Sequence, residues 1–173
     1  MSQRPQKPLL WMATCGLALV SPPAAAQNPF IGNTIYTAYS DTEIRCGPDG
    51  CTTTLSHPLG AHTLFFSRDG HIFDYAGRLQ KGAGKGTMAR LGEPYEAPGA
   101  AGYRFVWLQS GGSIVVRAFN PTTNYKREAA YTAVGDACQI TIKSFQPGYT
   151  FKNSVNLAFC KLFQGNPDEN IKP

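Results

Sequence analysis

The segment that decides the fold reads TLFFSRDGHIFDY, residues Thr63–Tyr75. Its Asp69-Gly70 pair is a strong signal for a tight turn between two antiparallel strands. A two-residue turn pairs Arg68 with His71, Phe66 with Phe73 and Leu64 with Tyr75. Because side chains alternate between the two faces of a strand, the last two pairs share a face and form an apolar patch. We expect the other strands to pack around this patch.

A second hairpin is predicted over Tyr103–Phe119, with Gly111-Gly112 as its turn. This turn sets Trp107 opposite Val116 and Phe105 opposite Ala118. One face of the hairpin then carries five apolar side chains, which are Tyr103, Phe105, Trp107, Ile114 and Val116. This face is the strongest core signal in the chain.

Four further segments have the alternation of strands: Asn33–Tyr39, Thr52–Leu55, Ala137–Phe145 and Ser154–Phe163. The run His57–Gly60 contains a proline, so we expect it to end the strand before it. In Ala137–Phe145 the inward side chains are Cys138, Ile140 and Ile142. In Ser154–Phe163 one face carries Val155, Leu157 and Phe159, and the other carries Asn156, Ala158 and Cys160.

Residues Tyr125–Val134 have a mixed pattern. Glu128, Ala129 and Ala130 suit a helix, whereas the alternation of Tyr125, Arg127 and Tyr131 favours a strand. We interpret the segment as a strand. Many short strands separated by turn signals predict an all-β domain. The expected fold is a single antiparallel β-sandwich or a small up-and-down β-barrel of about eight strands, stabilised by disulfides.

The N-terminal residues 1–26 have the layout of a secretory signal peptide. Arg4 and Lys7 precede the mostly apolar run Leu9–Val20, and Ala24-Ala25-Ala26 offers a cleavage site. The apolar run is too short to span a bilayer, which needs about 20 residues. We therefore expect cleavage near Ala26, a secreted or periplasmic protein, a single β domain over 27–165 and a flexible tail over 166–173.

The charge of the chain excludes one class of partner. Loss of Arg4 and Lys7 lowers the formal net charge from +5 to +3, which is far from the strongly basic balance of nucleic-acid-binding proteins. We expect no nucleic-acid partner, no transmembrane segment after signal cleavage, and a monomer. The expected partner is a small ligand or an envelope protein.

Four cysteines remain after signal cleavage: Cys46, Cys51, Cys138 and Cys160. An even number in an exported chain indicates disulfides, because the compartments outside the cytoplasm are oxidising. Cys46 and Cys51 flank the turn sequence GPDG, which brings its two ends together. The predicted pairs are therefore Cys46–Cys51 and Cys138–Cys160. The C-x₂-C pairs that structural zinc sites use are absent, so we expect no metal.

The residues Ala76–Gly102 form the longest stretch without clear periodicity. They include the glycine-rich run KGAGKGT at 81–87, which differs from a phosphate-binding loop because Gly86 follows Lys85 where Ser or Thr is required. Long loops in compact domains are usually functional or disordered. We predict a ligand-binding element here, carried by Arg78, Lys81, Lys85 and Arg90.

Catalytic chemistry has weaker signals. The three histidines are His57, His62 and His71, and Asp69 and Asp74 lie near the last of them. Asp69 belongs to the predicted turn, and Asp74 points to the face opposite His71 on an ideal strand. Carboxylates for glycosidic chemistry are available, but no local pattern pairs them; they are Asp41, Glu43, Glu93, Glu96 and Glu128.

The leading functional hypothesis is a non-enzymatic exported β-domain that binds a small ligand or a protein at one end through the 76–102 loop. No cofactor is expected. If the strands close into a barrel, its interior or mouth is the natural ligand site. The alternatives are a small exported hydrolase with His62 or His71 as its base, and a structural component of the cell envelope.

Overall fold

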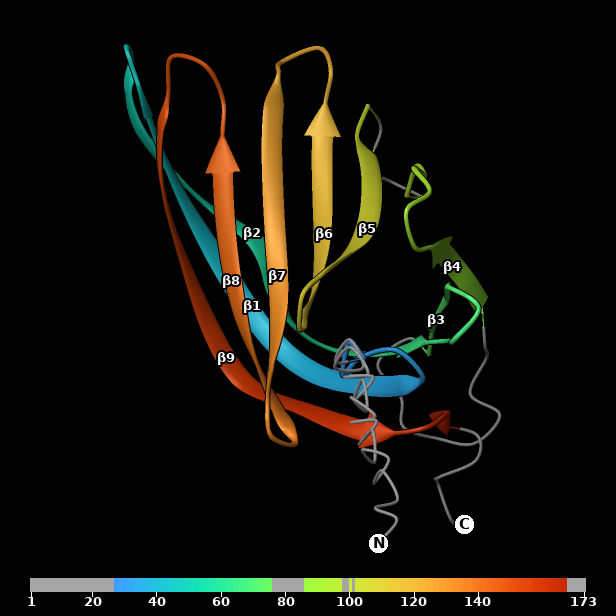
Figure 1. Cartoon of the computed structure of the whole chain (residues 1–173). Coiled ribbons are helices and arrows are strands. Elements are labelled where there is room, and N and C mark those ends of the chain that lie inside the picture. Colours follow the sequence, from blue (N-terminus) through green and yellow to red (C-terminus); the bar gives the residue numbers. More distant parts are fainter. Residues whose placement is uncertain (1–26, 76–85, 98–99, 101, 168–173) are drawn as a thin grey trace, which may run out of the picture.

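The computed structural model describes residues 27–75, 86–97, 100 and 102–167, which form one antiparallel sheet of nine strands (Figure 1). Each strand lies beside the next one in the chain, and β1 pairs with β9. The strands are β1 Asn33–Gly47, β2 Gly50–Phe66, β3 His71–Asp74, β4 Gly86–Arg90, β5 Arg104–Ser110, β6 Ser113–Asn120, β7 Tyr125–Val134, β8 Ala137–Phe145 and β9 Thr150–Gln164.

The two edge strands of this sheet, β4 and β5, lie side by side, so the sheet is a nearly closed barrel. Leu91 and Tyr95, which follow β4, form isolated bridges to Trp107 and Phe105. The N–H of Tyr95 donates to the carbonyl of Phe105 at 2.8 Å, and the reverse bond has the same length. The predicted all-β fold is thereby confirmed, in its up-and-down barrel form. Within the described part of the chain, no helix is long and apolar enough to cross a membrane.

The first hairpin has a different register from the predicted one. Its turn contains three residues, Arg68–Gly70, and the N–H of Ser67 donates to the carbonyl of His71 at 2.9 Å. Gly70 takes φ +89°, which fits the left-handed residue that ends a three-residue hairpin loop. The extra turn residue shifts the pairing by one position. The observed pairs are Leu64 with Asp74, Phe65 with Phe73 and Phe66 with Ile72.

The shift changes which side chains face the core. Ile72 is fully buried opposite the fully buried Phe66. Phe73 instead stacks on Phe65, with ring centroids 6.0 Å apart, and both rings are only half-buried. The predicted pairing of Phe66 with Phe73 is therefore wrong.

The second hairpin has the predicted register. Trp107 pairs with Val116 and Phe105 with Ala118 across the Gly111-Gly112 turn. Tyr125–Val134 is a strand, β7, as its alternation predicted. In β8 the three residues predicted to point inward are buried, and those between them are exposed.

Strand β2 does not end at His57–Gly60, which corrects that prediction. It continues from Gly50 to Phe66 and pairs with β1 throughout, with irregular register around Asp41 of β1. The irregularities accommodate Pro58, because a proline is tolerated within a sheet at bulges and edges.

A bulge in β9 decides which way Cys160 points. Ala38 pairs with Phe159 and Tyr39 with Leu157, so Ala158 is an extra residue in β9. The extra residue reverses the alternation, which corrects the predicted face of Cys160. Cys160 is buried and forms a disulfide with Cys138. The other predicted pair, Cys46–Cys51, is also present, so both predicted disulfides are confirmed.

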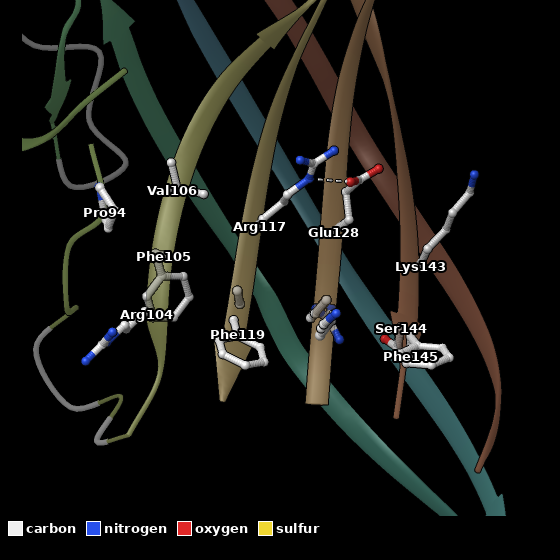
Figure 2. Close-up of a pocket in the computed structure, with 13 residues that line it drawn as sticks. Pro94, Arg104, Phe105, Val106, Arg117, Phe119, Glu128, Lys143, Ser144 and Phe145 are labelled. Atoms are coloured by element: carbon white, nitrogen blue, oxygen red, sulfur yellow. Dashed lines mark hydrogen bonds and ion pairs between the residues drawn. The ribbon is translucent and has the colours of Figure 1, made fainter. Parts of the chain in front are cut away.

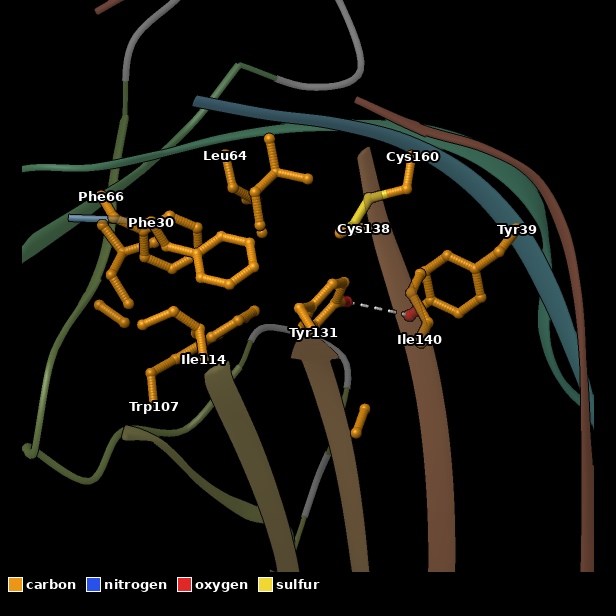
Figure 3. Packing of buried hydrophobic residues seen from close by; sticks show 14 of the residues in the cluster. Phe30, Tyr39, Leu64, Phe66, Trp107, Ile114, Tyr131, Cys138, Ile140 and Cys160 are labelled. Atoms are coloured by element: carbon orange, nitrogen blue, oxygen red, sulfur yellow. Dashed lines mark hydrogen bonds between the residues drawn. A yellow bond between two sulfur atoms is a disulfide. The ribbon is translucent and has the colours of Figure 1, made fainter. Parts of the chain in front are cut away.

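The apolar core lies at the end of the barrel where β1 and β6 begin, which we call the core end (Figure 3). Phe66 contacts Phe30 edge-on at 6.3 Å between ring centroids and Trp107 at 5.7 Å. Asn28 closes this end, because its side-chain amide donates to the carbonyls of Gly111 and Ser113 at 2.8 Å. The core end is therefore packed and sealed.

The stretch 76–102, predicted to be irregular, includes a strand. Residues 86–90 form β4, which pairs with β3, and Leu91 and Tyr95 continue along β5. Residues 76–85, with Arg78, Lys81 and Lys85, lie outside the described residues, as does the predicted signal peptide, 1–26. Of the predicted tail, Asn166 accepts a hydrogen bond from the hydroxyl of Tyr75 at 3.0 Å.

Candidate functional site

The inner face of β1 changes from apolar to charged along its length. Ile35, Tyr39, Asp41 and Glu43 are two or four positions apart, so they all point into the barrel. Ile35 and Tyr39 belong to the core, whereas the next two inward positions are carboxylates. The side chain of Asp41 is 0% exposed and that of Glu43 is 11% exposed. Buried carboxylates of this kind need a counter-charge.

Arg127 of β7 supplies the counter-charge from the opposite wall of the barrel. Its guanidinium donates from Nη2 to Oδ2 of Asp41, and its Nη1 lies 3.6 Å from Oε2 of Glu43. Burial opposes the charge of Arg127, but its hydrogen bonds with Asp41 and Tyr125 outweigh that effect and raise the pKa of the guanidinium. Arg127 is thus a fixed cation between two carboxylates.

Two hydroxyl groups complete this polar cluster. The hydroxyl of Tyr125 donates to Oε2 of Glu43 at 2.6 Å, and the hydroxyl of Ser144 donates to the same oxygen. Burial and the bond to Glu43 both raise the pKa of Tyr125. Tyr125 therefore stays protonated at neutral pH and acts as a hydrogen-bond donor.

Below the polar cluster, two tyrosines of the core lie next to it. The hydroxyl oxygens of Tyr39 and Tyr131 are 3.2 Å apart (Figure 3). Burial raises the pKa of Tyr131 well above its ordinary value, and the neighbouring Tyr39 adds to the effect. The pKa of Tyr39 is raised as well, chiefly by burial. Both hydroxyls are therefore neutral at physiological pH.

Above the polar cluster the barrel opens into a cavity of about 680 Å³, which we call the mouth. Its lining residues include Arg45, near the end of β1, and Tyr125, the first residue of β7. Figure 1 shows that these strand ends lie at the end of the barrel opposite the core end. The volume of the mouth is in the usual range for small-molecule sites, about 300–1,000 Å³. The lining residues are Glu43, Arg45, Thr54, Ser56, Ala100, Tyr103, Phe105, Ala118, Thr123, Tyr125, Arg127 and Gln146.

Aromatic rings give the mouth its walls. Tyr103 meets Tyr125 edge-on with ring centroids 6.1 Å apart, and Tyr125 meets Phe151 in the same way at 5.9 Å. At the rim the guanidinium of Arg45 lies over the ring of Tyr149, 5.0 Å from its centroid. The mouth thus combines flat aromatic surfaces with hydrogen-bonding groups of both charges.

Two buried atoms of the polar cluster have no hydrogen-bond partner among the described residues: Oδ1 of Asp41 and Nη1 of Arg127. Such atoms are rare in native proteins, because leaving a buried polar group unsatisfied costs about 1–3 kcal/mol. The polar cluster therefore carries a cost that an apolar cluster in the same place would avoid.

The predicted binding residues do not line the mouth where the structure describes them. Arg90 is exposed and pairs with Glu93 at 3.3 Å. Arg78, Lys81 and Lys85 cannot be placed because they fall in 76–85. Of the predicted loop, the structure places Ala100 at the mouth, and Tyr103, which follows the loop, lines it as well.

The candidate catalytic residues are distributed as follows. Nδ1 of His71 lies 3.1 Å from Oδ2 of Asp69, on an exposed turn, although the sequence interpretation had assigned Asp69 to the turn alone. Hydrogen bonds from Ser67 and His71 lower the pKa of Asp69 to about 2. His62 is half-buried on β2, and the side chain of His57 lies outside the described residues. The described residues contain no group of three or more metal-ligating side chains placed to hold a metal ion.

Asp41 and Glu43 are functional candidates that the sequence interpretation left unpaired. Their two-residue spacing continues the inward alternation of Ile35 and Tyr39, so the pattern already contained the signal. Their partner, Arg127, is 86 residues away from Asp41, and no local pattern announces it. A comparison of the chain with protein-family models, curated proteins and solved structures found no match.

Proposed function

We propose that the protein is an exported binding module that takes a small polar molecule into the mouth of its barrel. One observation carries the proposal: a cavity of about 680 Å³ lies over a buried guanidinium that two carboxylates hold in place. Concave sites with a few convergent polar groups among aromatic and apolar side chains are typical of small-ligand binding. Export is proposed from the signal-peptide layout of 1–26 and fits the two disulfides.

The lining favours a particular kind of ligand. Arg45, Arg127 and Glu43 line the mouth, and Asp41 lies beneath it and pairs with Arg127, so the formal charges of the mouth and its floor balance. The hydroxyls of its threonine, serine and tyrosine residues both donate and accept hydrogen bonds. A neutral or zwitterionic molecule with a flat ring, which stacks on Tyr103 or Tyr125, fits this surface best.

The same geometry gives less support to the hydrolase alternative. Within the described residues, the histidine–carboxylate pair of His71 and Asp69 lies on an exposed turn, away from the mouth. Tyr125 is held as a neutral donor, because its pKa is raised. A general base needs a place in the pocket and a pKa near the working pH. The His71–Asp69 pair lacks the first, and Tyr125 lacks the second.

The test is native mass spectrometry of protein purified from its own host, with one cavity-filling variant and a matched control. Thr54 lines the mouth, and Thr53 is the next residue of β2 and points to the other face. We expect a bound small molecule in the wild type and in Thr53→Trp, and at least tenfold less of it in Thr54→Trp. Equal retention in Thr54→Trp, or no bound molecule in the wild type, would contradict the proposal.

A further inference from the structure

A second concave surface lies on the outside of the barrel, across β5, β6, β7 and β8 (Figure 2). It is a groove of about 530 Å³, large enough for a small-molecule ligand. Its lining residues are Pro94, Arg104, Phe105, Val106, Arg117, Ala118, Phe119, Lys126, Arg127, Glu128, Lys143, Ser144 and Phe145. We call it the outer groove.

The strand register arranges the outward side chains of the groove in two rows. One row runs across the four strands as Arg104, Phe119, Lys126 and Phe145, because each of these residues pairs with the next. The adjacent row is Val106, Arg117, Glu128 and Lys143. Directly paired side chains in a sheet are close enough to touch, so each row forms a continuous surface.

The floor and walls of the groove are apolar. Phe119 and Phe145 pair with Lys126 from its two neighbouring strands. Val106, on β5, and Pro94 lie at one side of the groove (Figure 2). Phe145 is 56% exposed, a large apolar area to leave in water. These side chains point away from the barrel interior, so the packing of the core does not account for them. A concave apolar surface with a few polar groups around it is typical of small-ligand sites.

The charges of the groove are not balanced. Arg117 is neutralised by Glu128, with 2.8 Å between Nε and Oε2. For Arg104, Lys126 and Lys143, the described part of the chain places no carboxylate within ion-pair distance. Nζ of Lys126 lies 5.9 Å from the ring centroid of Phe119 and 6.0 Å from that of Phe145, so the two rings hold it between them. The groove therefore presents three uncompensated cations around an apolar floor.

We propose that the outer groove binds a free single-chain anionic amphiphile, with its acidic head at Lys126 and Lys143 and its hydrocarbon chain along Phe119 and Val106. Charge complementarity selects an anion, and the apolar floor selects a hydrocarbon rather than a simple ion. The four strands, spaced about 4.8 Å apart, give the groove a width of roughly 14 Å from Arg104 to Lys143. Its concave shape suits a single molecule better than the flat surface of a bilayer.

The test uses three amphiphiles with the same dodecyl chain, each below its micelle concentration. Dodecyl phosphate is the probe, dodecyltrimethylammonium and dodecyl maltoside are the cationic and uncharged controls, and inorganic phosphate tests the head alone. In isothermal titration calorimetry, we expect dodecyl phosphate to bind at least tenfold more tightly than either control amphiphile or inorganic phosphate. Its amide chemical-shift changes should centre on Phe119, Lys126 and Phe145.

Charge-reversal variants localise the site. Lys126→Glu should weaken dodecyl phosphate binding at least tenfold. Lys161→Glu makes the same charge change on β9, outside the groove, and should change the affinity less than twofold. Both substitutions fall on exposed strand positions, and thermal unfolding checks that each variant is folded. Thr54→Trp, which fills the mouth, should leave the affinity unchanged, so this inference and the proposed function fail separately.

Three results would overturn the inference. The first is equal binding of the cationic or uncharged amphiphile, which would remove the role of the cations. The second is equal weakening by Lys126→Glu and Lys161→Glu, which would indicate a nonspecific charge effect. The third is tight binding to vesicles with 30% anionic phospholipid but no binding of free dodecyl phosphate, which would assign the groove to a membrane surface.

Discussion

The two ends of the barrel are built from the same strands but bury opposite kinds of side chain. Strand β1 contributes Ile35 to the core end and Glu43 to the mouth, and β7 contributes Tyr131 below and Arg127 above. The core end buries aromatic and aliphatic side chains, which stabilises the fold in proportion to the apolar area removed from water. The mouth buries charges, which stabilises little or nothing once desolvation is counted. The comparison teaches that apolar packing and buried charge are separated along the barrel axis, and the proposed binding site lies at the charged end.

The largest effect is expected at the core end. Phe66→Ala removes a fully buried ring that contacts Phe30 and Trp107, and should lower the free energy of unfolding by about 4 kcal/mol. Phe65→Ala, at the next position of β2, removes a half-buried ring from the outer face and should cost less than half as much. Urea unfolding measures both. Equal losses would mean that the core end does not carry the stability.

The next largest loss of stability is expected at the mouth, from replacement of Arg127. Arg127→Met leaves two buried carboxylates without their cation, and should cost about 3 kcal/mol. Adding Asp41→Leu removes one of those carboxylates and should recover most of the loss, because a buried ion pair is often no better than apolar side chains of similar volume. Urea unfolding of the single and double variants decides the matter. A double variant as unstable as the single one would show that the ion pair itself stabilises the barrel.

The disulfides extend the comparison. Cys138–Cys160 joins residues 22 apart within the core, and Cys46–Cys51 joins residues five apart at the tip of the β1–β2 hairpin. On the loop-entropy model, replacing the pairs with alanine costs about 3 and about 2 kcal/mol. Burial of Cys138 and Cys160 adds to the first loss. Thermal unfolding of the two double variants should therefore rank Cys138→Ala/Cys160→Ala as the less stable. If the Cys46→Ala/Cys51→Ala variant were the less stable, the disulfide in the core would contribute less to stability than the one at the hairpin tip.

The smallest effect concerns the boundary between the two ends, where Tyr39 and Tyr131 meet. Their pKa values are raised in the folded state, so each tyrosine keeps a proton that the unfolded chain loses above about pH 10. The contribution is complete below that pH and is lost as the pH rises toward the folded-state pKa. Tyr131→Phe should make the loss of stability above pH 10 shallower, by up to about 1.4 kcal/mol per pH unit.

Thermal unfolding of the wild type and Tyr131→Phe between pH 8 and pH 11 measures this slope. All other titratable groups are common to both proteins, so their contributions cancel in the difference. Identical slopes would show that the Tyr131 hydroxyl ionises as readily in the folded barrel as in the unfolded chain.

Local patterns predicted much of the strand content. The second hairpin has its predicted register. Gly111-Gly112 favours a two-residue turn, and the apolar residues alternate on both sides of it. The predicted register of the first hairpin was wrong by one residue, because Asp69-Gly70 also fits a three-residue turn that includes Arg68. A short turn signal is thus a better predictor of the presence of a hairpin than of its register.

The candidate site was much less predictable. The 76–102 stretch breaks the periodicity, yet the described part of it contains a strand, β4, and contributes only Ala100 to the lining of the mouth. The outer groove was not predicted either, because Phe119, Lys126 and Phe145 come from three separate strands and become neighbours only in the folded sheet.

The sequence by itself determined the antiparallel β class, the face of most strands and both disulfide pairs. These features follow from alternation and turn residues, which act over a few positions, and from the pairing logic of four cysteines. The tertiary structure decided the barrel closure, the bulge at Ala158 and the meeting of Asp41 with Arg127. The physical reason is that these contacts join residues far apart in the chain. Their formation depends on the register of every strand between them, and a single extra residue in a turn or bulge changes which side chains meet.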